Sequence, residues 1–291
     1  MPLTDFLSLP PPGATSFKRP FIKMQGLRNH FVFIDQRNSS QPITPAEVVR
    51  ICDVHEGVGA EQVITIEAPS EAARAQGAYA FMGIFNIDGT EAEACGNATR
   101  CMAYLLFDES GRDHLLIDSR GGLLSCEKAG PMEVSVTLGP ISMDWRTIPL
   151  SRAEDTAHLP LQSGALRDGL ALHIGNPHAV FFVTDHGAID IPALAPAIAR
   201  DPLFAESANV GVAQVIDTHT LKLAVWERPG MLTEACGTGA CVAAYAGRLR
   251  GYLKGDTITV NLPAGPLNIR LLEDGRAIMT GPVEFCCAGY V

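Results

Sequence analysis

Two cysteines of this chain have nearly identical surroundings, although they are far apart in the sequence. Cys95 lies in EACGNATRC, which begins at Glu93, and Cys236 lies in EACGTGACV, which begins at Glu234. Each cysteine precedes a stretch with helical periodicity, so each is predicted at a helix N-terminus. The unpaired N–H groups and the dipole at that end stabilise negative charge and lower the pKa of a thiol. A cysteine there can act as a base or a nucleophile near neutral pH.

The residues after each cysteine suit the binding of an anion. Gly96-Asn97 and Gly237-Thr238 let a ligand approach the backbone, whose N–H groups can then hold a carboxylate. Inverting an α-carbon beside a carboxylate needs a base on one face, an acid on the other and donors for the developing enolate. A thiolate and a thiol at two such helix ends would supply these groups. A single cysteine of this kind is more often a small buried residue, and the repetition favours the chemical interpretation.

Composition and charge restrict the partners and cofactors. The chain has 291 residues, enough for one large domain or two of common size. Its 32 acidic and 22 basic residues give a formal charge of −10, which argues against nucleic acid and anionic membranes as partners. We find no bilayer-spanning segment or export signal and expect a cytoplasmic protein with reduced thiols. The eight cysteines lack zinc-like spacing, and no nucleotide-binding glycine loop is present, so we expect no metal or other cofactor.

The predicted elements are mostly short strands that end at turn residues. Thr44 and Glu47 predict a capping box for a helix that begins at Pro45. Each helix that follows a cysteine motif has one apolar stripe and ends near a glycine. The stripes and final glycines are Cys101, Met102, Leu105 and Leu106 with Gly111, and Cys241, Val242, Tyr245 and Leu249 with Gly251. The pattern predicts two similar halves, joined around 139–149, each with many strands and one buried central helix.

Six motifs, in order, resemble those of the diaminopimelate epimerase family, and the resemblance runs from about Phe21 to Gly289. They are MQGLRNHFVFID with Asn29, GAEQVITIE with Gln62, FNIDGTEAEACGNATRC with Asn86 and Cys95, GNPHAVFFV with Asn176 and His178, NVGVAQV with Asn209, and WERPGMLTEACGTGAC with Glu227, Arg228 and Cys236. This resemblance implies an α/β (α+β) fold of two pseudo-symmetric domains. Each domain would be a β-barrel-like sheet around a central helix, with the active site in the cleft between them.

The resemblance also implies that the last strand returns to complete the first domain. We therefore expect a flexible N-terminal tail at 1–17. A first domain, with Cys95, would comprise 18–139 plus 280–291, and a second domain, with Cys236, would comprise 140–279.

The resemblance assigns roles to individual residues. Cys95 and Cys236 would be the acid–base pair, and His178 and Glu227 would be catalytic residues that orient or assist the thiols. The implied substrate-binding residues are Asn29, Gln62, Asn86, Gly96, Asn97, Asn176, Asn209, Glu227, Arg228, Gly237 and Thr238. The implied reaction converts LL- to meso-diaminopimelate, in lysine and peptidoglycan precursor biosynthesis, without pyridoxal phosphate. We expect a small amino acid as the substrate and a homodimer as the assembly.

The chain departs from the family pattern at three places, which leaves the substrate open. Arg28-Asn29-His30 stands where the family has Gly-Asn-Asp, Ala98-Thr99 stands for Gly-Ala, and Pro229-Gly230-Met231 replaces a Gly-Ala-Gly turn. One alternative is a racemase of another amino acid, such as histidine. The other is a non-catalytic ligand-binding or redox protein on the same fold, and a disulfide between the paired thiols would be an oxidised form of either protein.

The remaining histidines and cysteines are interpreted as structural. We expect surface or satisfied core histidines at His30, His55, His114, His158, His173, His186 and His219. We expect packing residues at Cys101 and Cys241, and small buried residues at Cys52, Cys126, Cys286 and Cys287.

Overall fold

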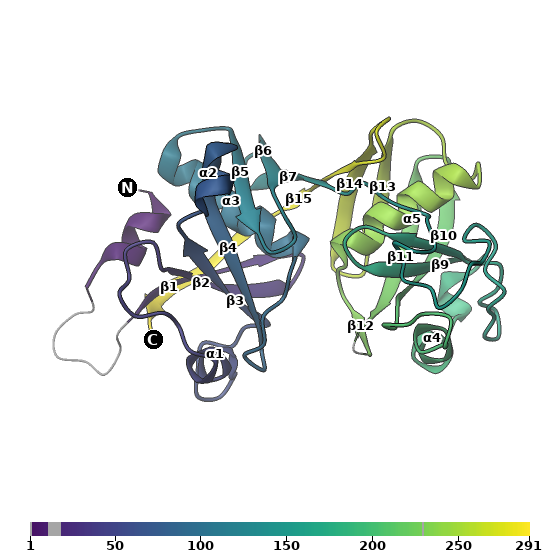
Figure 1. Cartoon of the computed structure of the whole chain (residues 1–291), viewed down its shortest axis with the longest axis horizontal. Helices are drawn as coiled ribbons and strands as arrows, with labels where there is room; N and C mark the ends of the chain where they lie inside the picture. Colours follow the sequence, from purple (N-terminus) through teal and green to yellow (C-terminus); the bar gives the residue numbers. More distant parts are fainter. Residues whose placement is uncertain (1, 11–18, 229) are drawn as a thin grey trace. The chain divides into compact units, whose positions relative to one another are not determined.

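The structure is a computed structural model that describes residues 2–10, 19–228 and 230–291. The chain divides into two compact units, which Figure 1 shows coloured along the sequence. The first unit comprises the chain up to Val136 together with Thr280–Val291, and the second comprises Thr137–Met279. The chain therefore enters the second unit after Val136, slightly earlier than the boundary at 139 that the sequence suggested.

The first unit is mostly β-sheet. Its strands are β1 (Pro20–Gly26), β2 (Asn29–Asp35), β3 (Gln62–Glu67), β4 (Ala78–Asn86), β5 (His114–Ser119), β6 (Leu124–Gly130), β7 (Glu133–Leu138), which continues into the second unit, and β16 (Glu284–Tyr290). Its helices are the 3-10 helix η1 (Leu3–Ser8), α1 (Pro45–Cys52), α2 (Glu71–Ala75) and α3 (Gly96–Ser110). The strand order is β16-β1-β2-β3-β4-β5-β6-β7, so the C-terminal strand lies beside β1.

The second unit is also mostly β-sheet and has one described α-helix fewer. Its strands are β8 (Leu170–His173), β9 (Pro177–Phe182), β10 (Asn209–Asp217), β11 (Thr220–Glu227), β12 (Met231–Thr233), β13 (Thr257–Leu262), β14 (Gly265–Leu271) and β15 (Ala277–Pro282), which continues into the first unit. Its helices are the 3-10 helix η2 (His186–Ala188), α4 (Ile191–Ala199) and α5 (Gly237–Leu249). The strand order is β15-β14-β13-β11-β10-β9-β8, and β12 pairs with β11.

The two units repeat one succession of strand pairings. In the first, β1–β2 is antiparallel, β2–β3 parallel, β3–β4 antiparallel, β4–β5 parallel and β5–β6 antiparallel. In the second, β8–β9, β9–β10, β10–β11, β11–β13 and β13–β14 follow the same alternation. Each parallel pair is joined through a helix, as parallel strands require. This repetition confirms the predicted mixed α+β fold of two similar halves.

Helix α3 is the centre of the first unit. It contacts β1, β2, β5 and β6, which come from distant positions in the strand order, so the sheet curves around the helix (Figure 1). The predicted stripe is confirmed, since Cys101, Met102, Leu105 and Leu106 are all fully buried. Each large side chain of this kind stabilises the fold by about 1.5–3 kcal/mol. Among the helices within the described ranges, none combines the length and apolar character needed to cross a bilayer.

Helix α5 has the same place in the second unit but packs through smaller residues. It contacts β9, β10, β11, β13 and β14. Gly239, Ala243 and Gly247 are spaced by four and share one buried face. A Cβ added to Gly239 would lie 2.8 Å from Val225 Cγ2, so a side chain is excluded there. The predicted stripe is wrong for Leu249, which is 50% exposed, because it lies about 200° around the helix from Gly247.

The N-terminal segment differs from the flexible tail expected at 1–17. Within residues 2–10, η1 packs against α3, β1 and β2, and Leu7 is buried. The Leu3 N–H donates to Asp108 at 2.7 Å, and the rings of Phe6 and Tyr290 are 5.2 Å apart. Apolar side chains within this short helix therefore attach it to the first unit. The rest of the expected tail, residue 1 and residues 11–17, lies outside the described residues.

All eight cysteines are free thiols, and two of them lie at the surface. Cys52 and Cys126 are buried, as predicted, and so are Cys101 and Cys241. The prediction is wrong for Cys286 and Cys287, which are exposed. Both belong to β16, the last strand in its order, and residues 284–288 are exposed along both faces of that strand. The two cysteines are exposed because β16 is an edge strand, and the order of the strands was not predicted from the sequence.

Candidate active site

Cys95 is the N-cap residue of α3, in the first unit. Its backbone is extended, with φ −151° and ψ 104°, and Gly96 begins the helix. The first N–H groups of an α-helix have no partner within the helix, and the helix dipole adds positive charge at the same end. The Cys95 Sγ lies 3.9 Å from Asn29 Oδ1, and Asn97 Nδ2 donates to the same oxygen at 3.3 Å. The predicted residues Asn29, Cys95 and Asn97 thus meet at one helix end.

Asn29 is held at this helix end by a tight turn. Gly26 pairs with Asn29 across the β1–β2 hairpin, so Leu27 and Arg28 form a two-residue loop. Both have positive φ, 53° and 61°, as a type I′ turn requires. Left-handed backbone costs about 1–2 kcal/mol for a residue with a side chain. The Arg28 N–H donates to Gln25 Oε1 at 2.6 Å, which supports the turn.

Two further predicted residues lie at the ends of neighbouring strands. Gln62 begins β3 and faces Asn86, the last residue of β4, across the antiparallel pair. The Gln62 amide donates to Asn86 Oδ1 at 3.0 Å, and Asn86 donates to Thr90 Oγ1 at 3.1 Å. Asn29 also donates to Glu61, which precedes Gln62. Amide groups that can bind ammonium or carboxylate therefore line the strand ends next to β2.

Cys236 has the corresponding position at α5, in the second unit. It is only 4% exposed, and its Sγ accepts a hydrogen bond from the Gly239 N–H at 3.3 Å. The Thr238 hydroxyl lies 3.6 Å from the sulfur, and the thiol is also hydrogen-bonded to Glu227. Burial, followed by the charge of Glu227, raises the pKa of Cys236 well above its ordinary value, against the opposing effects of Thr238 and Gly239. The lowered pKa that the helix end predicted is therefore wrong for Cys236, whose sulfur rests as a thiol beside a carboxylate.

His178 is fully buried between predicted substrate-binding residues. Its Nε2 lies 2.9 Å from Asn176 Oδ1, 3.2 Å from Thr238 Oγ1 and 3.4 Å from Asn209 Nδ2. Burial, with smaller contributions from Arg228 and His173, lowers the pKa of His178 to about 3. The ring is therefore neutral at physiological pH. A protonated Nε2 would donate to the Asn176 oxygen, whereas an unprotonated Nε2 would accept from the Asn209 amide, so the tautomer decides which contact forms.

Glu227 ends strand β11 and Arg228 follows it, and both residues are fixed by their neighbours. Thr233, from the paired strand β12, donates a hydrogen bond to the Glu227 carboxylate. The backbone N–H of Arg228 donates to Asn209 Oδ1 at 2.9 Å. The Arg228 side chain donates through Nη1 to the Glu206 carbonyl at 3.1 Å. Arg228 thus retains further N–H groups for a ligand carboxylate.

His173 belongs to this group of residues, although the sequence placed it among the structural histidines. Its Nδ1 accepts from the Gly175 N–H at 3.2 Å, in the loop that carries Asn176. Burial and the charge of Arg228 lower the pKa of His173, and Glu206 opposes that effect. The hairpin that pairs His173 with Pro177 brings it near His178. Thr233 was missed as well, and the signal available was its place within the second cysteine motif.

The predicted residues form one cluster in each unit. The first contains Asn29, Gln62, Asn86, Cys95, Gly96 and Asn97, and the second contains Asn176, His178, Asn209, Glu227, Arg228, Cys236, Gly237 and Thr238. Of the departures from the family pattern, Ala98 is fully buried in α3, whereas Met231 is 56% exposed and Pro229 lies outside the described residues. Within the described ranges, no three His, Cys, Asp or Glu side chains are grouped as a metal site.

Comparison with known proteins gives consistent results. The diaminopimelate epimerase family model matches residues 21–143 and 170–286, which include every residue of both clusters. The diaminopimelate epimerase of Rhodospirillum centenum is 42% identical over 271 residues, covering 93% of this chain and 91% of that protein. The diaminopimelate epimerase of Acidiphilium cryptum is also 42% identical, covering 93% and 95%.

Solved structures share the fold at low sequence identity. A predicted epimerase from Pseudomonas aeruginosa superposes with a TM-score of 0.65 at 15% identity, covering 94% of this chain and 99% of that chain. A hydroxyproline epimerase from Agrobacterium vitis, with bound trans-4-hydroxy-L-proline, has a TM-score of 0.62 at 14% identity and covers 94% and 92%. At these identities the likeness concerns the fold alone.

Proposed function

Because the chain belongs to the diaminopimelate epimerase family, we propose that it inverts the α-carbon of LL-diaminopimelate to give the meso form. The observation that carries the proposal is a cysteine at the N-cap of the central helix in each of two equivalent units, Cys95 at α3 and Cys236 at α5. Inversion at carbon requires one proton acceptor and one proton donor, and the two thiols provide one of each.

In the proposed reaction, one sulfur acts as thiolate and removes the α-proton, and the other sulfur, as thiol, gives its proton to the opposite face. The charge that develops on the substrate carboxylate is stabilised by the free N–H groups at Gly96-Asn97 and Gly237-Thr238. Each turnover exchanges the protonation states of the two sulfurs, and the reverse reaction restores them.

The residues around Cys236 suit the role of a proton donor at rest. Its raised pKa keeps the sulfur protonated, and Glu227 accepts a hydrogen bond from the thiol. His178, neutral and buried, positions Thr238 next to the sulfur. Both are therefore proposed to act on the thiol, as Asp and His partners do for other nucleophiles.

The remaining polar residues are proposed to bind the substrate. Arg228 offers a fork of N–H groups for a carboxylate, and amides can bind both ammonium and carboxylate groups. The amides proposed for this role are Asn29, Gln62, Asn86, Asn97, Asn176 and Asn209. Since the chain's own residues perform every proton transfer, we propose that catalysis proceeds without pyridoxal phosphate or metal, which a carbonyl reagent and a chelator would test by leaving the rate unchanged.

The function is tested by incubating the reduced protein with a panel of amino acids in deuterated water and following the α-proton by NMR. We expect exchange with LL- and meso-diaminopimelate and none with the other amino acids. Exchange with histidine or another simple amino acid alone would replace the substrate and retain the mechanism. No exchange with any of them would favour the ligand-binding or redox alternative.

We further propose a homodimer that forms through β16 and resides in the cytoplasm. Residues 285–290 carry no charge, and among the strands that the structure describes β16 lies at the end of the strand order, beside β1 alone. Proteins usually protect such an edge, and an antiparallel pairing of two copies would protect it symmetrically. Eight free thiols fit a reducing compartment. Light scattering tests the dimer, and a Phe285→Lys variant that remains dimeric would contradict this surface.

A further inference from the structure

A surface hollow of about 500 Å³ in the first unit is lined by three arginines, Arg37, Arg74 and Arg112. Tyr79 and Asn38 also line it, and no aspartate or glutamate does. Arg37 forms ion pairs with Asp35 and Glu109, so Arg74 and Arg112 carry the positive charge that the lining leaves for a ligand. The volume lies within the range of small-molecule sites.

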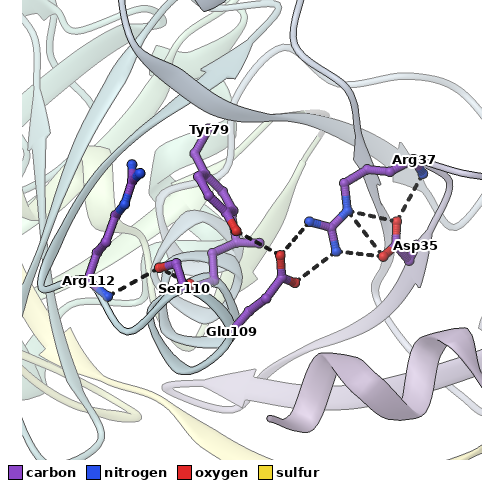
Figure 2. A network of polar contacts seen from close by, with 7 residues as sticks. Asp35, Arg37, Tyr79, Glu109, Ser110 and Arg112 are labelled. Atoms are coloured by element: carbon purple, nitrogen blue, oxygen red, sulfur yellow. Dashed lines mark hydrogen bonds and ion pairs between the residues drawn. The ribbon is translucent and has the colours of Figure 1, made fainter.

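A network of polar contacts fixes one wall of this hollow (Figure 2). Arg37 donates to Glu109 through Nη1 at 2.6 Å and Nη2 at 2.8 Å, and to Asp35 through Nη2 at 2.7 Å. The Tyr79 hydroxyl donates to Glu109 Oε1 at 2.9 Å. These bonds raise the pKa of Arg37 and commit its guanidinium to the two carboxylates. Arg37 and Tyr79 are therefore held in place before any ligand binds.

The other two arginines are available to a ligand. Neither Arg74 nor Arg112 forms an ion pair with a carboxylate in the part of the chain that the structure describes. Both are exposed, and the Arg112 guanidinium lies 5.6 Å from the centre of the Tyr79 ring. Tyr79 thus orients one guanidinium, and Arg74, which comes from α2, also lines the hollow. Two exposed arginines that line one hollow suit the recognition of phosphate or carboxylate groups.

We propose that this hollow binds a compact polyvalent anion, a phosphate ester or a polycarboxylate, through Arg74 and Arg112. The site is separate from the proposed active site, because Arg112 follows the C-terminal end of α3 and Cys95 precedes its N-terminal end. The 15 residues of α3 span roughly 22 Å. Anion binding at this hollow does not depend on the epimerase reaction, and the two proposals are tested by separate experiments.

Calorimetric titration of the full chain with pyrophosphate and with citrate, at low ionic strength, tests the site. We expect saturable binding with one anion per chain, which salt weakens. In an Arg74→Gln/Arg112→Gln double variant the affinity should fall by at least about tenfold, the effect of losing charge-assisted hydrogen bonds. Tighter binding of pyrophosphate would identify a phosphorylated ligand, and tighter binding of citrate a polycarboxylate.

The matched control is Arg146→Gln/Arg152→Gln, which removes two exposed arginines from the second unit. It changes the net charge equally and should leave the affinity unchanged. An equal loss in both double variants, or no saturable binding of either anion to the unmodified protein, would overturn the proposal.

Arginine modification by phenylglyoxal gives a second measurement on the unmodified protein. Pyrophosphate should protect Arg74 and Arg112 and leave Arg146 reactive, as mass spectrometry of the peptides would show. Arg112 also lies where the dipole at the end of α3 favours a cation. If that were its whole role, Arg112→Gln would lower thermal stability without affecting binding, and the proposal would fail.

Discussion

His178 Nε2 lies 3.2 Å from the Thr238 hydroxyl, and the same hydroxyl lies 3.6 Å from the sulfur of Cys236. His178 is on β9, whereas Thr238 and Cys236 are at the start of α5. The hydroxyl therefore connects a buried neutral imidazole to the proposed acid–base thiol. Because threonine supplies one rotatable hydroxyl, it can donate to one neighbour while accepting from the other.

Replacing Thr238 by valine should slow the reaction while leaving the fold intact. Valine retains the shape of threonine but removes the hydroxyl that contacts both His178 and Cys236. We expect kcat to fall by about tenfold, the effect of one lost hydrogen bond, with a smaller change in KM. Thr238→Ser should restore most of the rate. A valine variant with an unchanged kcat would show that the bridge has no part in catalysis.

Replacing Glu227 by glutamine should make Cys236 ionise at lower pH. Burial is the largest cause of the raised pKa of the Cys236 thiol, and the negative charge of Glu227 is the second. A neutral amide in place of the carboxylate removes that charge. Alkylation by iodoacetamide requires the thiolate. The pH at which alkylation of Cys236 reaches half its maximal rate should therefore be lower in the variant. Peptide mass spectrometry measures this rate at each pH.

Glu234→Gln is the matched control, since it removes the charge of an exposed glutamate in the same motif. Its alkylation profile should coincide with that of the unmodified protein. A Glu227→Gln profile that stays in place, or moves to higher pH, would contradict the assigned contact between Glu227 and the thiol.

The buried His178 predicts a loss of stability in acid. Its pKa is about 3 in the folded protein and 6.5 for the ordinary side chain, so between these values the unfolded chain binds the additional proton. Stability should therefore decline as pH falls below 6.5, by up to about 1.4 kcal/mol per pH unit from this one group. Urea unfolding at pH 5 to 7.5 measures the slope.

A His178→Gln variant should show a smaller slope over that range. His173 and His186, whose pKa values are also lowered, keep their contributions of the same sign in the variant. The carboxylates with lowered pKa, such as Glu109, lose their contributions at pH values below this window. Equal slopes for the two proteins would contradict a neutral buried His178.

Local sequence signals predicted the elements that carry both cysteines. The capping box of Thr44 and Glu47 is present, with Thr44 Oγ1 accepting from the Glu47 N–H at 3.3 Å. Helices α3 and α5 begin directly after Cys95 and Cys236, as the motifs predicted. These features depend on residues within one or two turns of each other, so a single sequence contains the information.

Contacts that depend on strand pairing could not be predicted from such local signals. His173 lies near Arg228 and His178 because β8 pairs with β9 and β9 pairs with β10. Thr233 reaches Glu227 because β12 folds back on β11. Neither contact has a periodicity or a spacing that marks it, although Thr233 lies within the second cysteine motif. The sequence therefore predicted the cysteines and amides of the proposed active site. It predicted only some of the residues that orient them.

The exposure of β16 gives the last prediction, a difference in reactivity between classes of thiol. Cys286 and Cys287 are exposed, and although desolvation also raises the pKa of Cys286, burial raises that of Cys52 to about 11 and that of Cys126 to about 12. At high dilution and neutral pH, a disulfide reagent such as DTNB should label Cys286 and Cys287 well before Cys52 and Cys126, and peptide mass spectrometry would give the order. Cys286→Ser/Cys287→Ser should remove the corresponding fast phase, and Cys52→Ala should leave it. At concentrations where the proposed homodimer forms through β16, labelling of the two exposed thiols should slow. Slow labelling at every concentration would contradict the exposed edge, and fast labelling of a dimeric protein would place the interface elsewhere.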